Sequence, residues 1–152
     1  MERKALEAWL HRHIPLSAAM QVQVKTVEPE RVILRAPLRP NRNHQHTAFG
    51  GSVSTMALLA AWALIHARLR DARIAHRLVV QRQEIDYQRP VTGPLLARAI
   101  WLDPDEWPTF VRALREKGKA RIDVVAFLEQ NRESAAHFHG TFVALAPEEL
   151  VY

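Results

Sequence analysis

The chain has no cysteine, which excludes a disulfide framework, thiolate chemistry and a cysteine-ligated zinc site. It also has no aspartate or glutamate between residues 41 and 70, which read NRNHQHTAFGGSVSTMALLAAWALIHARLR. Carboxylates are common general bases in enzymes. A base acting from this stretch would therefore be a histidine, or a water molecule held by hydroxyl groups.

Export and membrane signals are also lacking. The N-terminal MERKALEAWLHRHIPLS carries charges throughout and has no apolar core of signal-peptide length. The uncharged run over residues 56–65 reaches only His66, whereas a membrane-spanning helix needs about 20 apolar residues. We expect a cytoplasmic protein that does not insert into a membrane, with this run forming a buried helix.

The length and charge limit the domain count and the partners. A chain of 152 residues with 48% hydrophobic content suits one compact core, so residues 1–152 are expected to form a single domain. A net charge of +5 and a pI near 10.2 suit an acidic partner. However, the basic residues are scattered among acidic ones without a Lys/Arg run or zinc-finger spacing, so no nucleic-acid binding is expected.

Periodicity predicts an alternation of helices and paired strands. Helical spacing of apolar residues predicts helices over residues 2–13, 49–70 and 105–117, the last ended by Gly118. Alternation predicts strands over residues 20–26, 31–38, 78–91, 95–102, 119–130 and 134–145, with a turn at Asn131-Arg132. The middle helix is apolar nearly all round and must be enclosed by protein. A curled antiparallel sheet wrapped round it is the simplest α+β architecture.

A glycine pair opens this middle helix and is the first candidate site. Backbone N–H groups at a helix N-terminus have no intrahelical partner, and the helix dipole favours negative charge there. Gly50 and Gly51 could therefore stabilise an oxyanion, as such donors do in acyl-transfer enzymes. The alternative is that the glycines only permit a turn and close packing. Ser52 is placed to cap the helix or to lie in its first turn.

Several motifs carry a family likeness over nearly the whole chain. A long helix begins at two glycines, and the strand after it ends in Ile-x-Tyr-x-x-Pro-Val-x-Gly at residues 85–93. This pattern resembles the hotdog fold. The block NxxHTAFGGSxxxMALLAAW from Asn43, with GKAR at residues 118–121 and FHGTFVAL at residues 138–145, resembles the thioesterase-like family typified by the C-terminal domain of YiiD.

The resemblance implies an assembly and a substrate. It implies a homodimer or a dimer of dimers that binds an acyl thioester of coenzyme A or of acyl carrier protein. The site would lie at the subunit interface, beside the N-terminus of the central helix. No cofactor is expected apart from the coenzyme A that forms part of the substrate.

The site residues follow from this chemistry and this resemblance. The catalytic candidates are Asn43, His46, Gly51 and Ser52, and the substrate-binding candidates are Thr47, Ala48, Phe49, Gly50, Tyr87 and Arg89. An imidazole suits general-base work near neutral pH, although His46 could equally be an ordinary loop residue. Asn43 could hold water or the thioester carbonyl, or it could be a turn residue. The Ser52 hydroxyl has no evident adjacent base, so it is expected to cap the helix or orient a water.

The usual carboxylate of better-known hotdog thioesterases is missing. Those relatives carry an acid two turns into the helix, where residues 57–59 here are Ala-Leu-Leu. The strand that follows the helix runs back along it. Comparing the length of the helix with that of the strand places residues 85–89 at the level of the glycine pair. Alternation then places Ile85 and Tyr87 on one face, and Glu84 and Asp86 on the other. The two carboxylates would serve a neighbouring subunit, or pair with arginines on a solvated face.

Residue spacing also bears on metal binding and phosphate binding. Three His-x-His pairs, at residues 11/13, 44/46 and 137/139, lack a carboxylate partner at ligand spacing, so no metal site is expected. Arg89, Lys119 and Arg121 could meet the phosphates of coenzyme A or form a solvated face.

The sequence thus favours an acyl-thioester hydrolase. The alternative is a non-catalytic acyl-thioester-binding or assembly protein, which the missing helix carboxylate makes credible. A hotdog dehydratase fits less well, because it too usually needs a helix acid beside its histidine.

Overall fold

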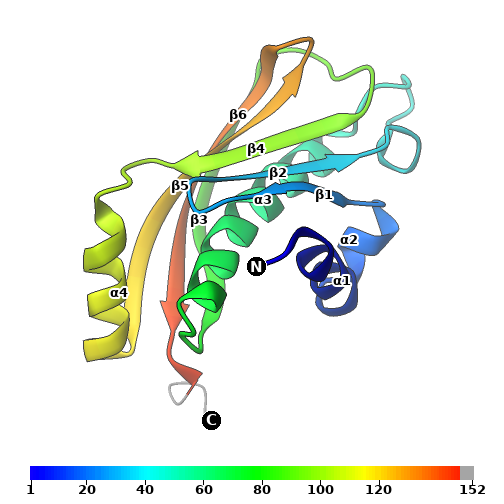
Figure 1. Cartoon of the computed structure of the whole chain (residues 1–152). Helices are drawn as coiled ribbons and strands as arrows, with labels where there is room; N and C mark the ends of the chain where they lie inside the picture. Colours follow the sequence, from blue (N-terminus) through cyan, green and yellow to red (C-terminus); the bar gives the residue numbers. More distant parts are fainter. Residues whose placement is uncertain (148–152) are drawn as a thin grey trace.

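A computed structural model of the chain describes residues 1–147 (Figure 1). Its elements, in chain order, are α1 (Arg3–His13), α2 (Pro15–Ala19), β1 (Gln23–Val27), β2 (Arg31–Ala36), the 3-10 helix η1 (Arg39–Asn41), α3 (Gly50–Asp71), β3 (Arg77–Tyr87), β4 (Leu95–Trp101), α4 (Glu106–Lys117), β5 (Lys119–Gln130) and β6 (Glu133–Leu145). The predicted α+β class and the three longer helices are therefore confirmed.

One six-stranded sheet curls round α3 (Figure 1). Its strand order is β1-β2-β4-β5-β6-β3, and every neighbouring pair is antiparallel. Alternation sends one set of side chains inward to α3, and these are fully buried at Leu34, Ala97, Val124 and Phe138. The core thus lies between the concave face of the sheet and the central helix.

Helix α3 is enclosed on most sides but not on all of them. Its 22 residues are long and apolar enough to cross a membrane by length and composition, yet 67% of its most apolar window is buried in the fold. One stripe, formed by Ser54, Leu58 and Trp62, stays half-buried. Most apolar residues of α3 therefore serve the protein core, and this stripe is partly accessible.

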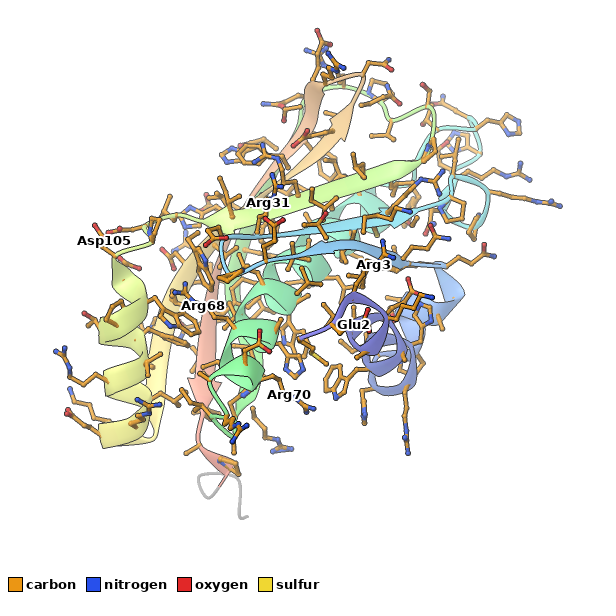
Figure 2. The ribbon with its side chains drawn as sticks, viewed as in Figure 1. Glu2, Arg3, Arg31, Arg68, Arg70 and Asp105 are labelled. Atoms are coloured by element: carbon orange, nitrogen blue, oxygen red, sulfur yellow. The ribbon has the colours of Figure 1, made fainter. Side chains whose placement is uncertain are left out.

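The far end of α3 is tied to α4 through an arginine. Figure 2 labels Arg68 and Arg70 near this end of the helix. The Arg68 guanidinium lies 4.3 Å from the Trp107 ring centroid and 5.4 Å from that of Trp101. Burial lowers the pKa of Arg68, and the aromatic faces compensate its charge.

Two predicted turns are confirmed by their backbone angles. Gly118 ends α4 with φ 71°, a left-handed conformation that glycine adopts without strain, and its N–H donates to the Leu114 carbonyl at 3.0 Å. Asn131 and Arg132, with φ 53° and 64°, form the two-residue connection between β5 and β6.

The N-terminal third departs from the prediction in three places. Pro15 ends α1 as expected, but it also occupies the first turn of α2, where its missing N–H costs nothing. The strand predicted from Met20 begins only at Gln23, because Met20 caps α2 and Gln21 turns the chain with φ 61°. Within the predicted polar loop, residues 39–41 form η1.

Candidate active site

The N-terminus of α3 is fixed by its flanking loop and left uncapped. The Phe49 N–H donates to the Asn41 carbonyl at 2.7 Å, and the Ala48 N–H donates to the Val91 carbonyl at 2.8 Å. Within residues 1–147, no side chain caps this helix and its first turn contains no acid. The amides of Gly50 and Gly51 are therefore free to donate at the positive end of a long helix.

One pocket of about 350 Å³ adjoins Gly50. It is lined by Thr47, Ala48, Gly50, Val53, residues 87–91 and Ala135. The Tyr87 hydroxyl donates to the Gly50 carbonyl at 2.9 Å, so the end of β3 does return to the helix N-terminus as predicted. This pocket brings together five of the substrate-binding candidates: Thr47, Ala48, Gly50, Tyr87 and Arg89.

A second pocket of about 320 Å³ adjoins Gly51. Its walls come from α2, η1 and α3, and its lining residues are Leu16, Ala19, Met20, Pro40, Asn41, Phe49, Gly51, Ser52 and Thr55. The Phe49 ring lies against Gly51, and a Cβ added to Gly51 would be 2.4 Å from a carbon of this ring. Phe49, Gly51 and Ser52 thus lie together here, with Ser52 in the first helical turn.

Asn43 organises the loop that leads to the helix. Its Oδ1 accepts from the backbone N–H groups of Gln45, at 2.8 Å, and Thr47, at 3.2 Å, and its Nδ2 donates to Thr47 Oγ1 at 2.8 Å. Both ends of the amide are therefore engaged within the loop. Asn43 lines neither pocket, and its hydrogen bonds are of the kind expected for a turn residue, the alternative considered for it.

His46 is exposed on the same loop. It adopts φ 62°, and its N–H donates to the Asn43 carbonyl at 3.2 Å, closing a tight turn. Its side chain lines neither pocket. The structure therefore does not bring His46 and Asn43 together with Gly51 and Ser52 in this chain.

Among residues 1–147, no aspartate or glutamate lines either pocket. Glu84 pairs with Arg82 at 3.1 Å on the outer sheet face, as the solvated-face alternative expected. Arg89 instead forms its ion pair with Glu133, at the rim of the Gly50 pocket. At the position of the usual helix acid, Ala57 and Leu59 are buried in the core.

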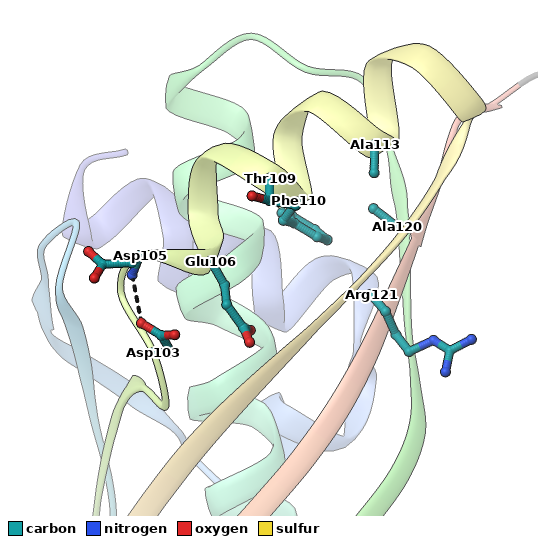
Figure 3. Close-up of a pocket in the computed structure, with 8 residues that line it drawn as sticks. All are labelled: Asp103, Asp105, Glu106, Thr109, Phe110, Ala113, Ala120 and Arg121. Carbon is teal, nitrogen blue, oxygen red and sulfur yellow. Dashed lines mark hydrogen bonds between the residues drawn. The ribbon is translucent and has the colours of Figure 1, made fainter.

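Lys119 and Arg121 lie far from this site. They open β5, level with the start of β3, whereas the Gly50 pocket lies at the end of β3. Arg121 borders a separate hollow of about 330 Å³ between α4 and β5, where its side chain extends away from Asp103 and Glu106 (Figure 3). There Asp103 Oδ1 accepts from the Asp105 N–H at 3.0 Å, a bond that shapes the start of α4.

The burial of Asn41 and of His66 was not predicted from the sequence. Asn41 is buried in the second pocket, although nothing in the spacing of a polar, proline-containing loop marks a buried position. His66 is buried between Trp9 and Trp62 on the far half of α3. For His66, the only signal in the sequence was a histidine at an apolar position of the predicted helix.

Known proteins share this architecture over nearly its whole length. A protein of unknown function from Chlorobaculum tepidum TLS is 30% identical with a TM-score of 0.88, the match covering 95% of this chain and 94% of that one. A structure described as a putative thioesterase from Shewanella oneidensis is 26% identical with a TM-score of 0.83, covering 95% and 97%. A probable thioesterase from Pseudomonas aeruginosa, at 21% identity, a TM-score of 0.81 and coverage of 95% and 96%, shows the same fold.

The family model agrees with these structures. The model described as "Putative thioesterase (yiiD_Cterm)" matches residues 3–146, almost all of the described chain. The curled sheet, the enclosed helix and these neighbours confirm the predicted hotdog fold. The chain belongs to the YiiD C-terminal-domain family of thioesterase-like hotdog proteins.

Proposed function

We propose that the protein hydrolyses an acyl thioester of coenzyme A or of acyl carrier protein at the N-terminus of α3. The observation that carries the proposal is the uncapped helix start at Gly50 and Gly51, with a pocket on each glycine. The thioester carbonyl oxygen would accept from these amides. Donors of this kind favour the tetrahedral intermediate because negative charge develops on the oxygen there.

The reaction needs one water molecule and no cofactor. Water adds to the carbonyl carbon, the intermediate collapses with cleavage of the C–S bond, and the products are a carboxylic acid and a thiol. Ser52 lies in the first turn of α3, and among residues 1–147 its hydroxyl has no hydrogen-bond partner. In the proposal this hydroxyl positions the water beside the carbonyl.

His46 lines neither pocket of its own chain, so in the proposal it acts as the base on this water from a second copy, because no described residue that lines the pockets is a carboxylate. The rate of thiol release by the variant His46→Gln tests whether His46 is the base. Loss of thiol release would support a base function. Unchanged release would remove His46 from the mechanism and leave the oxyanion assignment intact.

A second copy of the chain would complete the site. Strand β3 ends the sheet, with β6 as its only partner among residues 1–147. On β3, Val80 and Ile85 lie opposite the fully buried Phe142 and Phe138, so they face the concave side, yet Val80 remains 39% exposed. Together with the half-buried stripe on α3, this face suits a homodimer formed through β3.

The polar side of the Gly50 pocket suits a phosphate-bearing thiol. Arg89 is half exposed at the rim, and its guanidinium already holds a carboxylate, that of Glu133. A guanidinium binds phosphate through the same planar set of donors. Arg89 is therefore proposed to contact the thiol portion of the substrate.

The test is thiol release from purified protein supplied with acyl-CoA and acyl-carrier-protein substrates of graded chain length. The proposal predicts release above the uncatalysed rate for at least one substrate. No release from any of them would overturn it. The missing carboxylate favours a second candidate, a non-catalytic acyl-thioester binder, which predicts binding of the same compounds without release.

A further inference from the structure

Tyr87 lies against the first residue of α3, although 37 positions separate it from Gly50 in the chain. Its hydroxyl donates to the Gly50 carbonyl at 2.9 Å. Its ring lies beside the same residue, since a Cβ added to Gly50 would be 3.6 Å from a ring carbon. The end of β3 therefore supplies a hydrogen-bond donor to the backbone at the start of the central helix.

The accepting carbonyl and the Gly51 N–H belong to the same peptide unit. Because a peptide unit is planar, a donor that holds its carbonyl also fixes the direction of its N–H. Hydrogen bonds in a chain polarise one another, so a bond accepted by the carbonyl makes the N–H of that unit a stronger donor. The Tyr87 hydroxyl is thus placed to act on one of the two amides that the proposed function uses.

The Gly50 amide is held in a different way. Its N–H shares a peptide unit with the Phe49 carbonyl, which accepts from the Val53 N–H at 3.0 Å, an ordinary bond of the helix. The Gly50 carbonyl has two lone pairs, so it can accept from the Tyr87 hydroxyl in addition to a helical N–H. The contact from Tyr87 therefore acts on the Gly51 amide in particular.

The backbone around Tyr87 holds its hydroxyl in position. Tyr87 is the last residue of β3 and pairs with Ala136 of β6. The next two N–H groups, those of Gln88 and Arg89, donate to the Ala135 carbonyl at 2.8 and 3.1 Å. A tyrosine side chain has only two torsions, so a fixed backbone leaves its hydroxyl little freedom.

We infer that Tyr87 is a positioning residue for the oxyanion site, whose hydroxyl orients and polarises the Gly51 amide. The inference rests on the proposed function, in which the Gly51 N–H donates to the thioester oxygen. A phenol hydroxyl has one proton, and the Gly50 carbonyl accepts it, so this proton does not serve the substrate. Tyr87 also lines the Gly50 pocket, so a substrate there shields the hydrogen bond from water and strengthens it.

The test compares thiol release by wild type and Tyr87→Phe. Phenylalanine keeps the ring beside Gly50 and lacks the donor. Removing a whole oxyanion donor lowers kcat about 100- to 1,000-fold, and a neighbouring hydrogen bond changes the strength of the next one by about 10–30%. Tyr87→Phe should therefore lower kcat about two- to eightfold with KM unchanged, because the stronger donor acts in the transition state.

Two further measurements exclude a general structural effect. Replacement of Tyr87 by 4-aminophenylalanine returns an N–H donor to the same ring position and should restore most of kcat. Without substrate, the ¹⁵N resonance of the Gly51 amide should move upfield in Tyr87→Phe, and by more than that of Gly50, because the Gly51 peptide unit loses the bond to its carbonyl. A hydroxyl that donated to the substrate would instead raise KM on removal and leave kcat unchanged.

The outcomes separate this inference from the proposed function. Equal kcat in wild type and Tyr87→Phe, or a change in KM alone, overturns the positioning role and leaves hydrolysis standing. A fall in kcat that 4-aminophenylalanine does not restore also overturns it. No thiol release by wild type overturns hydrolysis, and the Gly51 resonance then still supports or rejects polarisation by Tyr87.

Discussion

Gly50 and Gly51 are neighbours in sequence but differ in what surrounds their α-carbons. A Cβ on Gly50 would lie 3.6 Å from the Tyr87 ring, an ordinary contact, whereas a Cβ on Gly51 would lie 2.4 Å from the Phe49 ring. Alanine in place of glycine in a helix generally stabilises by up to about 1 kcal/mol. We expect Gly50→Ala to show this gain and Gly51→Ala to show less of it, because Phe49 must move. Urea unfolding measures both, and equal gains would contradict the described position of Phe49.

Asn43 gives a second prediction for a single residue. Asn43→Ala removes three hydrogen bonds of the loop and should lower the free energy of unfolding by about 1–2 kcal/mol. Asn43→Asp keeps both backbone acceptor contacts and can accept from the Thr47 hydroxyl, so it should lose much less. Chemical denaturation compares the two variants. An equal loss in both would show that the loop does not depend on the Oδ1 contacts.

The same loop shows how far single residues can be interpreted from sequence. The types and spacing of residues 43–52 marked the site, because glycines and hydroxyl residues before an apolar helix have recognisable chemistry. They could not decide between the two readings of Asn43, since a turn and a water site use the same amide. Nor could they single out Asn41, whose burial depends on contacts with α2 and the residues before η1.

Among the elements, α1 and α3 meet through a cluster of aromatic and histidine rings. His66 lies 4.2 Å from Trp9 and 4.7 Å from Trp62 between ring centroids, and its Nδ1 is 3.0 Å from His76 Nε2. His76 Nδ1 is 2.8 Å from the Ile74 carbonyl, so it carries the proton there and its Nε2 accepts from His66. His66 Nε2 is then buried and, within residues 1–147, has no partner.

This cluster predicts a pH dependence of stability. Burial, followed by the nearby His76, Arg70 and His13, lowers the pKa of His66 to about 3, and burial also lowers the pKa of His76. Below the ordinary histidine pKa of about 6.5, His66 binds a proton in the unfolded chain but stays neutral in the folded chain. The free energy of unfolding therefore falls as the pH drops. His66 alone should contribute a slope of up to about 1.4 kcal/mol per pH unit between pH 6.5 and about 3.

The variant His66→Phe isolates this contribution. Phenylalanine keeps an aromatic ring between Trp9 and Trp62 and cannot take up a proton. The free energy of unfolding should therefore depend less steeply on pH between 4 and 6.5 in this variant than in wild type. His44→Gln, at an exposed loop position, should keep the wild-type slope. Parallel curves for all three proteins would show that His66 is not held neutral by the fold.

Long elements show a clear period and were predicted more closely than short ones, although β3 ends at Tyr87 and not at residue 91 as predicted. Helix α3 and strand β5 extend over 22 and 12 residues, and the pattern placed the ends of both within one residue. Helix α2 and η1 have five and three residues, too few for a helical repeat, and they were missed. Both contribute walls to the pocket beside Gly51, which was therefore not predicted from the sequence.

At the scale of the whole molecule, Val80 on the concave side of β3 remains 39% exposed, which is the basis of the proposed dimer. We predict by light scattering a mass twice the 17.4 kDa of one chain. Val80→Lys places a charge on the exposed, inward-facing part of β3 and should shift the protein toward monomer. Leu102→Lys, at an exposed leucine elsewhere, should not. A monomeric wild type, or an unshifted Val80→Lys, would contradict assembly through β3.

The overall architecture was accessible from sequence because the family likeness extends over nearly the whole chain. The chemistry of the site was less accessible, since the walls of the pockets come from α2, η1, β3 and the loop after β3, which only folding brings together. The proposed hydrolysis also involves the face that a second copy is proposed to cover. That face is visible only once the register places Val80 and Ile85 on the concave side.

One measurement tests the central proposal most directly, the rate of thiol release by Gly50→Pro compared with Gly50→Ala. Gly50 is the first residue of α3, and Phe49 before it is extended, with φ −62° and ψ 134°, so proline fits without breaking the helix. Proline removes the N–H, and alanine keeps it. If this amide stabilises the oxyanion, Gly50→Pro should fold normally and release thiol about 100- to 1,000-fold more slowly than Gly50→Ala. Equal rates in two folded variants would contradict the assignment.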